Sequence, residues 1–156
     1  MNQIHEHVWI ADRQTVVRNS ISHIDHVITV CQDGVEDNIS SDTTYNQFSL
    51  ADGETDKYKS GTCTYALFED AANALYTALK NTEDNILIHC HAGQSRSSSV
   101  AIAAIARIRQ DKFTPTFRDI KDNHPQTDPN ITLRDLARKY INTYTPENRY
   151  VPNLDE

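Results

Sequence analysis

The chain has 156 residues, 38 % of them hydrophobic and 24 % charged, which suits one domain with a buried core. Its formal net charge of −7 disfavours nucleic acid and anionic membranes as partners, because phosphate groups attract Lys and Arg. No apolar run reaches the ~18 residues that span a bilayer, and no secretory signal is visible, so we expect a cytoplasmic protein. The three cysteines are odd in number and widely spaced, which is not the pattern of a disulfide framework.

Short strands and amphipathic helices alternate along the sequence. The strands are rich in β-branched residues, and the helices repeat apolar residues at the helical period. In chain order we predict a strand at 7–11, a helix at 14–21, a strand at 26–31, a loop at 33–42, a strand at 45–50, a helix at 65–80, a strand at 86–88, and helices at 97–110, 116–121 and 133–144. Thr132, with Asp135 three residues later, is the predicted cap of the last helix.

This alternation predicts an α/β fold, with a central, mainly parallel sheet of about four to five strands flanked by helices. We find no internal repeat and no Pro/Gly-rich linker that divides the chain. We therefore expect residues 1–145 to form a single domain and residues 146–156 to form a C-terminal tail.

The stretch that follows the strand at 86–88 carries the chemistry. A buried strand leads into a short loop with Cys90 and Arg96, and a buried helix follows. Backbone N–H groups in such a loop, together with the helix N-terminus, form an anion site in which a cysteine thiol ionises readily. Arg96 offers a planar pair of donors for two phosphate oxygens. Cys90 is therefore the candidate nucleophile on a bound phosphorus, and Arg96 its phosphate ligand.

The sequence HCHAGQSRSS, residues 89–98, resembles the signature of the cysteine-dependent protein phosphatases, in the form HCxxGxSRS of the dual-specificity branch. HVWIA and HVITVC resemble the two opening strands of that branch. FSLAD is similar to its strand ending in a general-acid Asp, and DPNITLRDL to its closing Pro-Asn and helix. The resemblance extends over residues 8–144, and its one departure is a longer stretch, GETDKYKSGTC, between the acid and the cysteine.

The resemblance implies a dual-specificity-phosphatase-like fold and a phosphoric monoester hydrolase. Such an enzyme acts on phosphotyrosine and on phosphoserine or phosphothreonine through a phosphocysteine intermediate. Asp52 is the implied general acid, with Asp56 as its rival because the following loop is extended. The hydroxyl of Ser97 is implied to steady the leaving thiolate, although it is also an ordinary helix N-terminal hydroxyl. His89 is expected to orient the loop. The expected phosphate ligands are the Arg96 side chain and the backbone N–H groups of His91, Ala92, Gly93, Gln94, Ser95 and Arg96.

A phosphoprotein is the expected substrate and partner. The chain leaves little room for the additional loop that deepens the pocket of tyrosine-specific relatives, so we expect a shallow cleft. The loop also lacks the lysines of phosphoinositide-cleaving relatives. The preference among phosphoresidues stays open. We expect a monomer that needs no cofactor and no metal.

Two other functions are compatible with parts of this pattern. One is a phosphate-binding module of the same fold without turnover, and the presence of Cys90, Arg96 and an upstream Asp argues against it. The other is a sulfurtransferase or another thiol enzyme, which the Ser-Arg-Ser ending of the loop disfavours. A metal site is disfavoured as well, because neighbouring side chains such as His89 and Cys90 point to opposite faces of a strand.

Cys31 is a possible redox partner of Cys90. It ends the strand at 26–31, which we expect beside the strand at 86–88, because successive parallel strands are usually neighbours. A nearby thiol can trap an oxidised cysteine as a disulfide, and some phosphatase relatives have a similarly placed resolving cysteine. We expect Cys63 to take no part. The alternative is that Cys31 only fills the core.

Overall fold

The computed structural model describes residues 1–19, 21–52, 63–81 and 83–145. Its strands are β1 (Asn2–His5), β2 (Val8–Asp12), β3 (His26–Thr29), β4 (Thr44–Gln47) and β5 (Ile86–Cys90). They form one sheet in the order β1-β2-β5-β3-β4, in which β1 is antiparallel to β2 and the other described pairs are parallel. Val8 and His26 both pair with Ile86. The carboxyl ends of β2, β3 and β5 therefore meet at one edge of the sheet.

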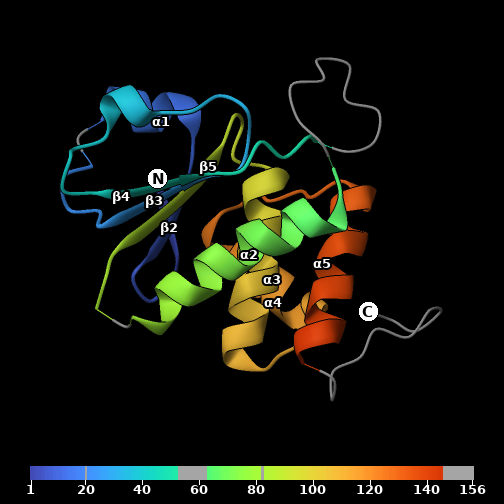
Figure 1. The fold of residues 1–156 in the computed structure, drawn as a ribbon. Coiled ribbons are helices and arrows are strands. Elements are labelled where there is room, and N and C mark those ends of the chain that lie inside the picture. Colours follow the sequence, from blue (N-terminus) through green and yellow to red (C-terminus); the bar gives the residue numbers. More distant parts are fainter. Residues whose placement is uncertain (20, 53–62, 82, 146–156) are drawn as a thin grey trace.

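The helices cover both faces of this sheet. They are α1 (Arg13–Arg18), α2 (Tyr65–Lys80), α3 (Arg96–Arg109), α4 (Phe113–Asn123) and α5 (Ile131–Tyr144), with a short 3₁₀ turn at Glu36–Asn38. Figure 1 shows α1 on one face and α2 to α5 gathered on the other. None of the helices in the described part of the chain is long and apolar enough to cross a membrane. The predicted α/β fold with a mostly parallel sheet is confirmed.

Each face of the sheet has its own hydrophobic core. Ile86 and Ile88 of β5 belong to the larger core, together with side chains of α2 to α5. Leu87 belongs to the smaller core, with Val16 of α1. This alternation follows from the strand geometry, in which successive side chains point to opposite faces. Cys90 therefore lies on the face of the larger core, and His89 on the face of α1.

Helix α3 is the central helix of the larger core. All its residues from Arg96 to Ala106 are buried, and it packs against α2, α4 and α5. Its first turn contains three serines, and the hydroxyls of Ser98 and Ser99 donate to backbone carbonyls three or four residues earlier. These bonds satisfy polar groups that burial would otherwise leave unpaired. A polar helix start can therefore lie inside the protein, next to the end of β5.

Two predicted strands end sooner than expected. The strands predicted at 26–31 and 45–50 stop at Thr29 and Gln47, where the pairing of β3 with β4 ends. Val30 and Leu50 are nevertheless fully buried. The apolar residues that favoured longer strands thus reflect burial of the segments leaving the sheet, and not pairing in it.

Strand β1 was not predicted. It forms a hairpin with β2 through a turn at Glu6 and His7, and His7 has a φ of 62°. Glycine or asparagine is the usual signal for such a turn, and neither stands there.

Several helix ends also differ from prediction. α1 begins after Asp12, whose side chain caps it, and ends at Arg18 rather than at 21. α4 is longer than the predicted 116–121 and begins at Phe113. Pro115 is tolerated there because it lies in the first turn, where the missing N–H breaks no helical bond. The predicted cap Thr132 is wrong, since Asn130 accepts the N–H of Leu133 over 3.0 Å and starts α5 earlier. The predicted tail at 146–156 lies outside the described residues.

Candidate active site

A short loop joins the central strand β5 to the central helix α3. Cys90 is the last residue of β5 and Arg96 is the first of α3, and their exposed fractions are only 2 % and 8 %. We call residues 90–96 the Cys–Arg loop. It lies at the sheet edge where β2, β3 and β5 end. The predicted order of buried strand, loop and buried helix around Cys90 is therefore observed.

Two polar groups converge on the sulfur of Cys90. The N–H of Gly93 donates to Cys90 Sγ over 3.2 Å, and the hydroxyl oxygen of Ser97 lies 3.2 Å from the same atom. One group comes from the Cys–Arg loop and the other from the first turn of α3. A buried sulfur in this place has polar partners whether or not it carries a proton.

Three backbone carbonyls of the Cys–Arg loop accept hydrogen bonds from other segments, and a fourth accepts one from the first turn of α3. Because the described peptide bonds are all trans, the N–H that follows each carbonyl points the opposite way. Where N–H groups of a loop turn to the same side, they form a concavity that can bind an anion. The four pairs are Arg13 N–H to His91 O, His124 Nε2 to Gly93 O, Asp128 N–H to Gln94 O, and Ser99 N–H to Ser95 O.

Gly93 occupies a position that disfavours any side chain. Its φ of 70° lies in the left-handed region, which costs an L-residue free energy. A Cβ at this place would also lie 3.1 Å from backbone atoms of Ala11 and Asp12. The glycine therefore lets the Cys–Arg loop lie directly against the end of β2.

The guanidinium of Arg96 connects the loop to two other segments. Its Nη1 donates to Gln32 Oε1 over 3.1 Å and to the carbonyl of Leu50 over 3.2 Å. Gln32 follows β3, and Leu50 follows β4. Both contacts are made by the same nitrogen, so they fix the plane of the guanidinium from one end.

Asp52 reaches the site through Asn130. The side-chain amide of Asn130 donates to the carbonyl of Asp52 over 2.7 Å and to its Oδ1 over 2.9 Å. The backbone N–H of Asn130 donates to Ser95 Oγ over 2.9 Å. One residue at the start of α5 thus bridges Asp52 and the Cys–Arg loop. The rival acid, Asp56, lies outside the described residues.

His89 takes part in a buried chain of hydrogen bonds. Its Nδ1 lies 3.1 Å from the carbonyl of Cys90, which can only accept, so Nδ1 carries the proton. Nε2 then accepts a hydrogen bond from the Thr29 hydroxyl over 2.6 Å. The Thr29 oxygen accepts one from the Tyr45 hydroxyl over 2.8 Å, and the Tyr45 oxygen accepts one from the N–H of Val35 over 3.1 Å. Burial lowers the pKa of His89 to about 4, so the ring is neutral at pH 7. These contacts fit an orienting role.

The remaining loop residues differ in exposure. His91, Ala92 and Gln94 are exposed, whereas Ser95 is buried. His91 Nδ1 lies 3.4 Å from a carboxylate oxygen of Asp33, and both side chains are partly open to solvent. The Cys–Arg loop is therefore exposed at His91, Ala92 and Gln94 and buried towards α3.

Cys31 lies near Cys90 but has a different environment. β3 is the neighbour of β5, as predicted, but it ends at Thr29, so Cys31 lies beyond the strand and not at its end. Cys31 is buried. Its thiol donates to the carbonyl of Asp33 over 3.5 Å. Burial raises the pKa of Cys31 to about 11. The two cysteines are not joined by a disulfide. The redox role of Cys31 stays a prediction.

Four polar side chains at this site were not assigned a role from the sequence. None of them stands in a local pattern that points to the Cys–Arg loop, except that Asn130 belongs to the quoted Pro-Asn sequence. They are Thr29, Gln32, His124 and Asn130.

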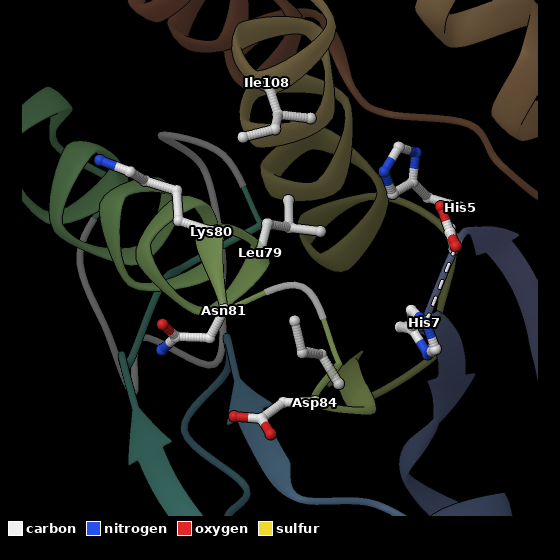
Figure 2. Close-up of a pocket in the computed structure, with 9 residues that line it drawn as sticks. His5, His7, Leu79, Lys80, Asn81, Asp84 and Ile108 are labelled. Atoms are coloured by element: carbon white, nitrogen blue, oxygen red, sulfur yellow. Dashed lines mark ion pairs between the residues drawn. The ribbon is translucent and has the colours of Figure 1, made fainter.

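A second pocket lies at the opposite end of the parallel strands, near the start of β5. Ile86, the first residue of β5, lines it, together with Leu79 of α2 and Ile108 of α3. Figure 2 shows it with His5, the ion pair of His7 with Glu6, and Asp84 around its margin. Cys90 is at the other end of β5, so this pocket and the Cys–Arg loop are separate features.

Comparison with known proteins relates the sequence and the fold to one group. Residues 8–142 match the family model described as the dual specificity phosphatase catalytic domain. No curated protein sequence gives a match.

Solved structures of similar fold include three mammalian proteins. Human DUSP28 is 15 % identical, with a TM-score of 0.77 over 94 % of this chain and 99 % of that chain. A mouse putative dual specificity phosphatase, complexed with zinc tungstate, is 18 % identical, with a TM-score of 0.72 over 94 % and 89 %. The human tyrosine phosphatase-like serine/threonine/tyrosine-interacting protein is 18 % identical, with a TM-score of 0.74 over 92 % and 97 %. At these identities the likeness concerns the fold.

Proposed function

Because the chain belongs to the family of dual specificity phosphatase catalytic domains, we propose that it hydrolyses phosphate monoesters of phosphoproteins through a phosphocysteine intermediate. The substrates are phosphotyrosine and phosphoserine or phosphothreonine. Residues 1–145 act as one catalytic domain, as a monomer, and without a cofactor or metal.

One observation carries this proposal: the polar groups around Cys90 are those that the reaction needs. The sulfur contacts the N–H of Gly93 and the hydroxyl of Ser97 at 3.2 Å. Four carbonyls of the Cys–Arg loop are hydrogen-bonded, and the N–H groups of the same four peptides supply an anion site next to the sulfur. Since Nη1 of Arg96 is held by Gln32 and Leu50, the other edge of the guanidinium is oriented to bind two phosphate oxygens.

The first step forms the intermediate. The thiolate of Cys90 attacks phosphorus, so a sulfur–phosphorus bond forms while the ester bond from phosphorus to the substrate oxygen breaks. Asp52 gives its proton to the departing oxygen, which leaves as an alcohol or phenol. Arg96 and the loop N–H groups stabilise the charge on the three phosphoryl oxygens.

The second step releases phosphate. Water attacks the phosphorus and loses a proton to the Asp52 carboxylate, which restores the acid. The sulfur–phosphorus bond breaks, and Cys90 leaves as a thiolate that accepts a hydrogen bond from Ser97. The products are inorganic phosphate and the unmodified enzyme, so atoms, protons and electrons balance.

The open rim of the site supports several phosphoresidues as substrates. His91, Ala92 and Gln94 are exposed where the substrate backbone would pass, so a short phosphoserine side chain can approach Cys90 as a phosphotyrosine can. The net charge of −7 disfavours polyanionic ligands such as RNA or inositide membranes.

The test is phosphate release from an aryl phosphate and from phosphopeptides by the wild type and by Cys90→Ser. We expect wild-type turnover that the variant loses by roughly 10⁴-fold or more, because the nucleophile is gone. Tungstate, a tetrahedral oxyanion, should still bind to Cys90→Ser, which shows that the site is folded. Wild-type protein that binds tungstate but releases no phosphate would point to the phosphate-binding module instead.

A further inference from the structure

His124 lies beside the Cys–Arg loop, just after α4. Only 1 % of its surface is exposed. Its Nε2 lies 2.6 Å from the carbonyl of Gly93, and its Nδ1 lies 2.8 Å from the side-chain nitrogen of Asn2 in β1. The residue therefore joins three parts of the chain that are distant in sequence, and one of them is the Cys–Arg loop.

The hydrogen bonds define the protonation state of the ring. A carbonyl oxygen can only accept, so Nε2 carries the proton and donates to Gly93. Nδ1 then has a lone pair, which accepts from the amide of Asn2. Burial lowers the pKa of His124, in agreement with a neutral ring. Asn2 thus selects the tautomer that can hold the Gly93 carbonyl.

The peptide between Gly93 and Gln94 is held from two sides. The backbone of Gly93 lies against Ala11 and Asp12, where even a Cβ would be as close as 3.1 Å to backbone atoms. His124 holds the carbonyl of the same peptide. Because the peptide bond is trans, the N–H of Gln94 points away from His124.

We propose that His124 is a positioning residue for the phosphate, which holds the Gly93–Gln94 peptide so that the N–H of Gln94 faces the bound oxyanion, with Asn2 fixing its tautomer. This inference rests on the proposed function of the Cys–Arg loop. Without the donor at Nε2, the peptide can rotate and present its carbonyl oxygen to the oxyanion, which would repel it. His124 itself touches neither the substrate nor Cys90.

A positioning role of this kind affects all substrates alike. The oxyanion is the same in every phosphate ester, so losing one oriented N–H weakens phosphate binding and turnover regardless of the leaving group. A loss of the general acid, in contrast, depends on the leaving group. This difference separates His124 from Asp52 in kinetic measurements.

The experiment compares two variants of His124 with a control in the preceding helix. His124→Leu keeps most of the volume and removes both ring nitrogens, whereas His124→Gln restores an amide N–H near the position of Nε2. The control is Thr116→Val in α4, which removes a buried hydroxyl that, among the described residues, donates to the carbonyl of Lys112. Each protein is measured for thermal unfolding, for tungstate binding by calorimetry, and for kcat/KM on a good and a poor leaving group.

We expect His124→Leu to weaken tungstate binding and to lower kcat/KM by ~10–100-fold, equally for both leaving groups. His124→Gln should recover most of both values. Thr116→Val should lower the unfolding temperature yet bind tungstate like the wild type, because it does not contact the Cys–Arg loop. If His124→Leu does not fold, Asn2→Ala takes its place. In that variant we expect a smaller loss of binding, and ¹⁵N NMR spectra in which the His124 ring is no longer protonated at Nε2 alone.

Three results would overturn the inference: wild-type tungstate binding by His124→Leu, a His124→Gln variant as weak as His124→Leu, or unchanged binding and tautomer in Asn2→Ala. A wild-type protein that binds tungstate without turnover, and loses that binding in His124→Leu, would refute the proposed enzyme activity and support the role of His124. The two proposals can therefore fail separately.

Discussion

The Cys–Arg loop and the segment of Leu50, Ala51 and Asp52 meet at the same edge of the sheet, but they are held in different ways. The loop lies between the central strand and the central helix, and three of its carbonyls accept hydrogen bonds from other segments. The acid segment, residues 50–52, follows β4, which is the outermost strand on its side of the sheet. Leu50 is buried and its carbonyl is bound by Arg96, whereas Asp52 is exposed and is bound by Asn130.

This difference predicts which substrates a substitution in each region should affect. The loop is fixed by many contacts, and in the proposed mechanism it acts on the phosphoryl group, which all substrates share. The acid segment lies beyond the outermost strand, and in the proposed mechanism its Asp52 acts on the leaving group, which varies. Changes in the loop should therefore lower the turnover of every substrate, and changes in the acid segment should lower it only where the leaving oxygen needs a proton.

Arg96→Lys should give the largest loss in this comparison. Lysine keeps the charge but cannot hold Gln32, Leu50 and two phosphate oxygens with one planar group. We expect kcat/KM to fall by ~10²–10³-fold on aryl phosphates with both good and poor leaving groups. If Arg96→Lys has a kcat/KM close to that of the wild type, the planar shape of the Arg96 side chain is not required.

Asp52→Asn should separate the two regions most clearly. We expect a loss of ~10²-fold on phosphotyrosine peptides and little change on an ester with an acidic leaving group. The fall in rate at high pH, which reports a required acid, should also disappear from the pH–rate profile. Asp56→Asn is the matched control, and the same pattern in that variant instead would assign the acid to Asp56.

Asn130→Ser should reproduce a weaker form of the Asp52 effect. Serine keeps a side-chain oxygen for the cap of α5, but it is too short to hold Asp52 as the Asn130 amide does. We expect about a tenfold loss on poor leaving groups only, since Asp52 remains but is less well placed. An equal loss on good and poor leaving groups would mean that Asn130 supports the loop through Ser95, and not the acid.

The pH dependence of stability should report the histidine behind the loop. The folded pKa of His89 is about 4 and its ordinary value is 6.5, so between these values the unfolded chain takes up a proton that the folded protein does not. The free energy of unfolding should therefore fall as pH falls from 6.5 to 4. Urea unfolding at a series of pH values should give a shallower dependence in His89→Gln. Parallel curves for the two proteins would show that another group is responsible.

Cys31→Ser should have the smallest effect on untreated enzyme. Cys31 is a protonated thiol at neutral pH, so it does not compete with Cys90 as a nucleophile. After mild peroxide and then a thiol reductant, the wild type should recover activity through a Cys31–Cys90 disulfide, and the variant should recover less. Peptide mapping of the oxidised protein identifies the bond. Equal recovery, or a bond to Cys63, would exclude Cys31 from such a mechanism.

The central strand, the Cys–Arg loop and the helix after it could all be predicted from the amino-acid sequence. The spacing of Cys90 and Arg96 is local, and the apolar runs on either side require burial, so a strand and a helix must meet there. Helix α2 spans Tyr65–Lys80, the same range as its apolar period predicts. Patterns of this kind depend on residues a few positions apart, which is why they can be seen in one sequence.

The contacts that hold the Cys–Arg loop and Asp52 could not be predicted from the sequence. His124 contacts Gly93 across 31 positions, Gln32 contacts Arg96 across 64, and Asn130 contacts Asp52 across 78. No periodicity or propensity links such pairs, because both operate over a few residues. These polar side chains stand in loops or at helix starts, where a cap or a turn explains each of them equally well. Their partners follow from the order of the strands in the sheet and from the packing of α3, α4 and α5 beneath it.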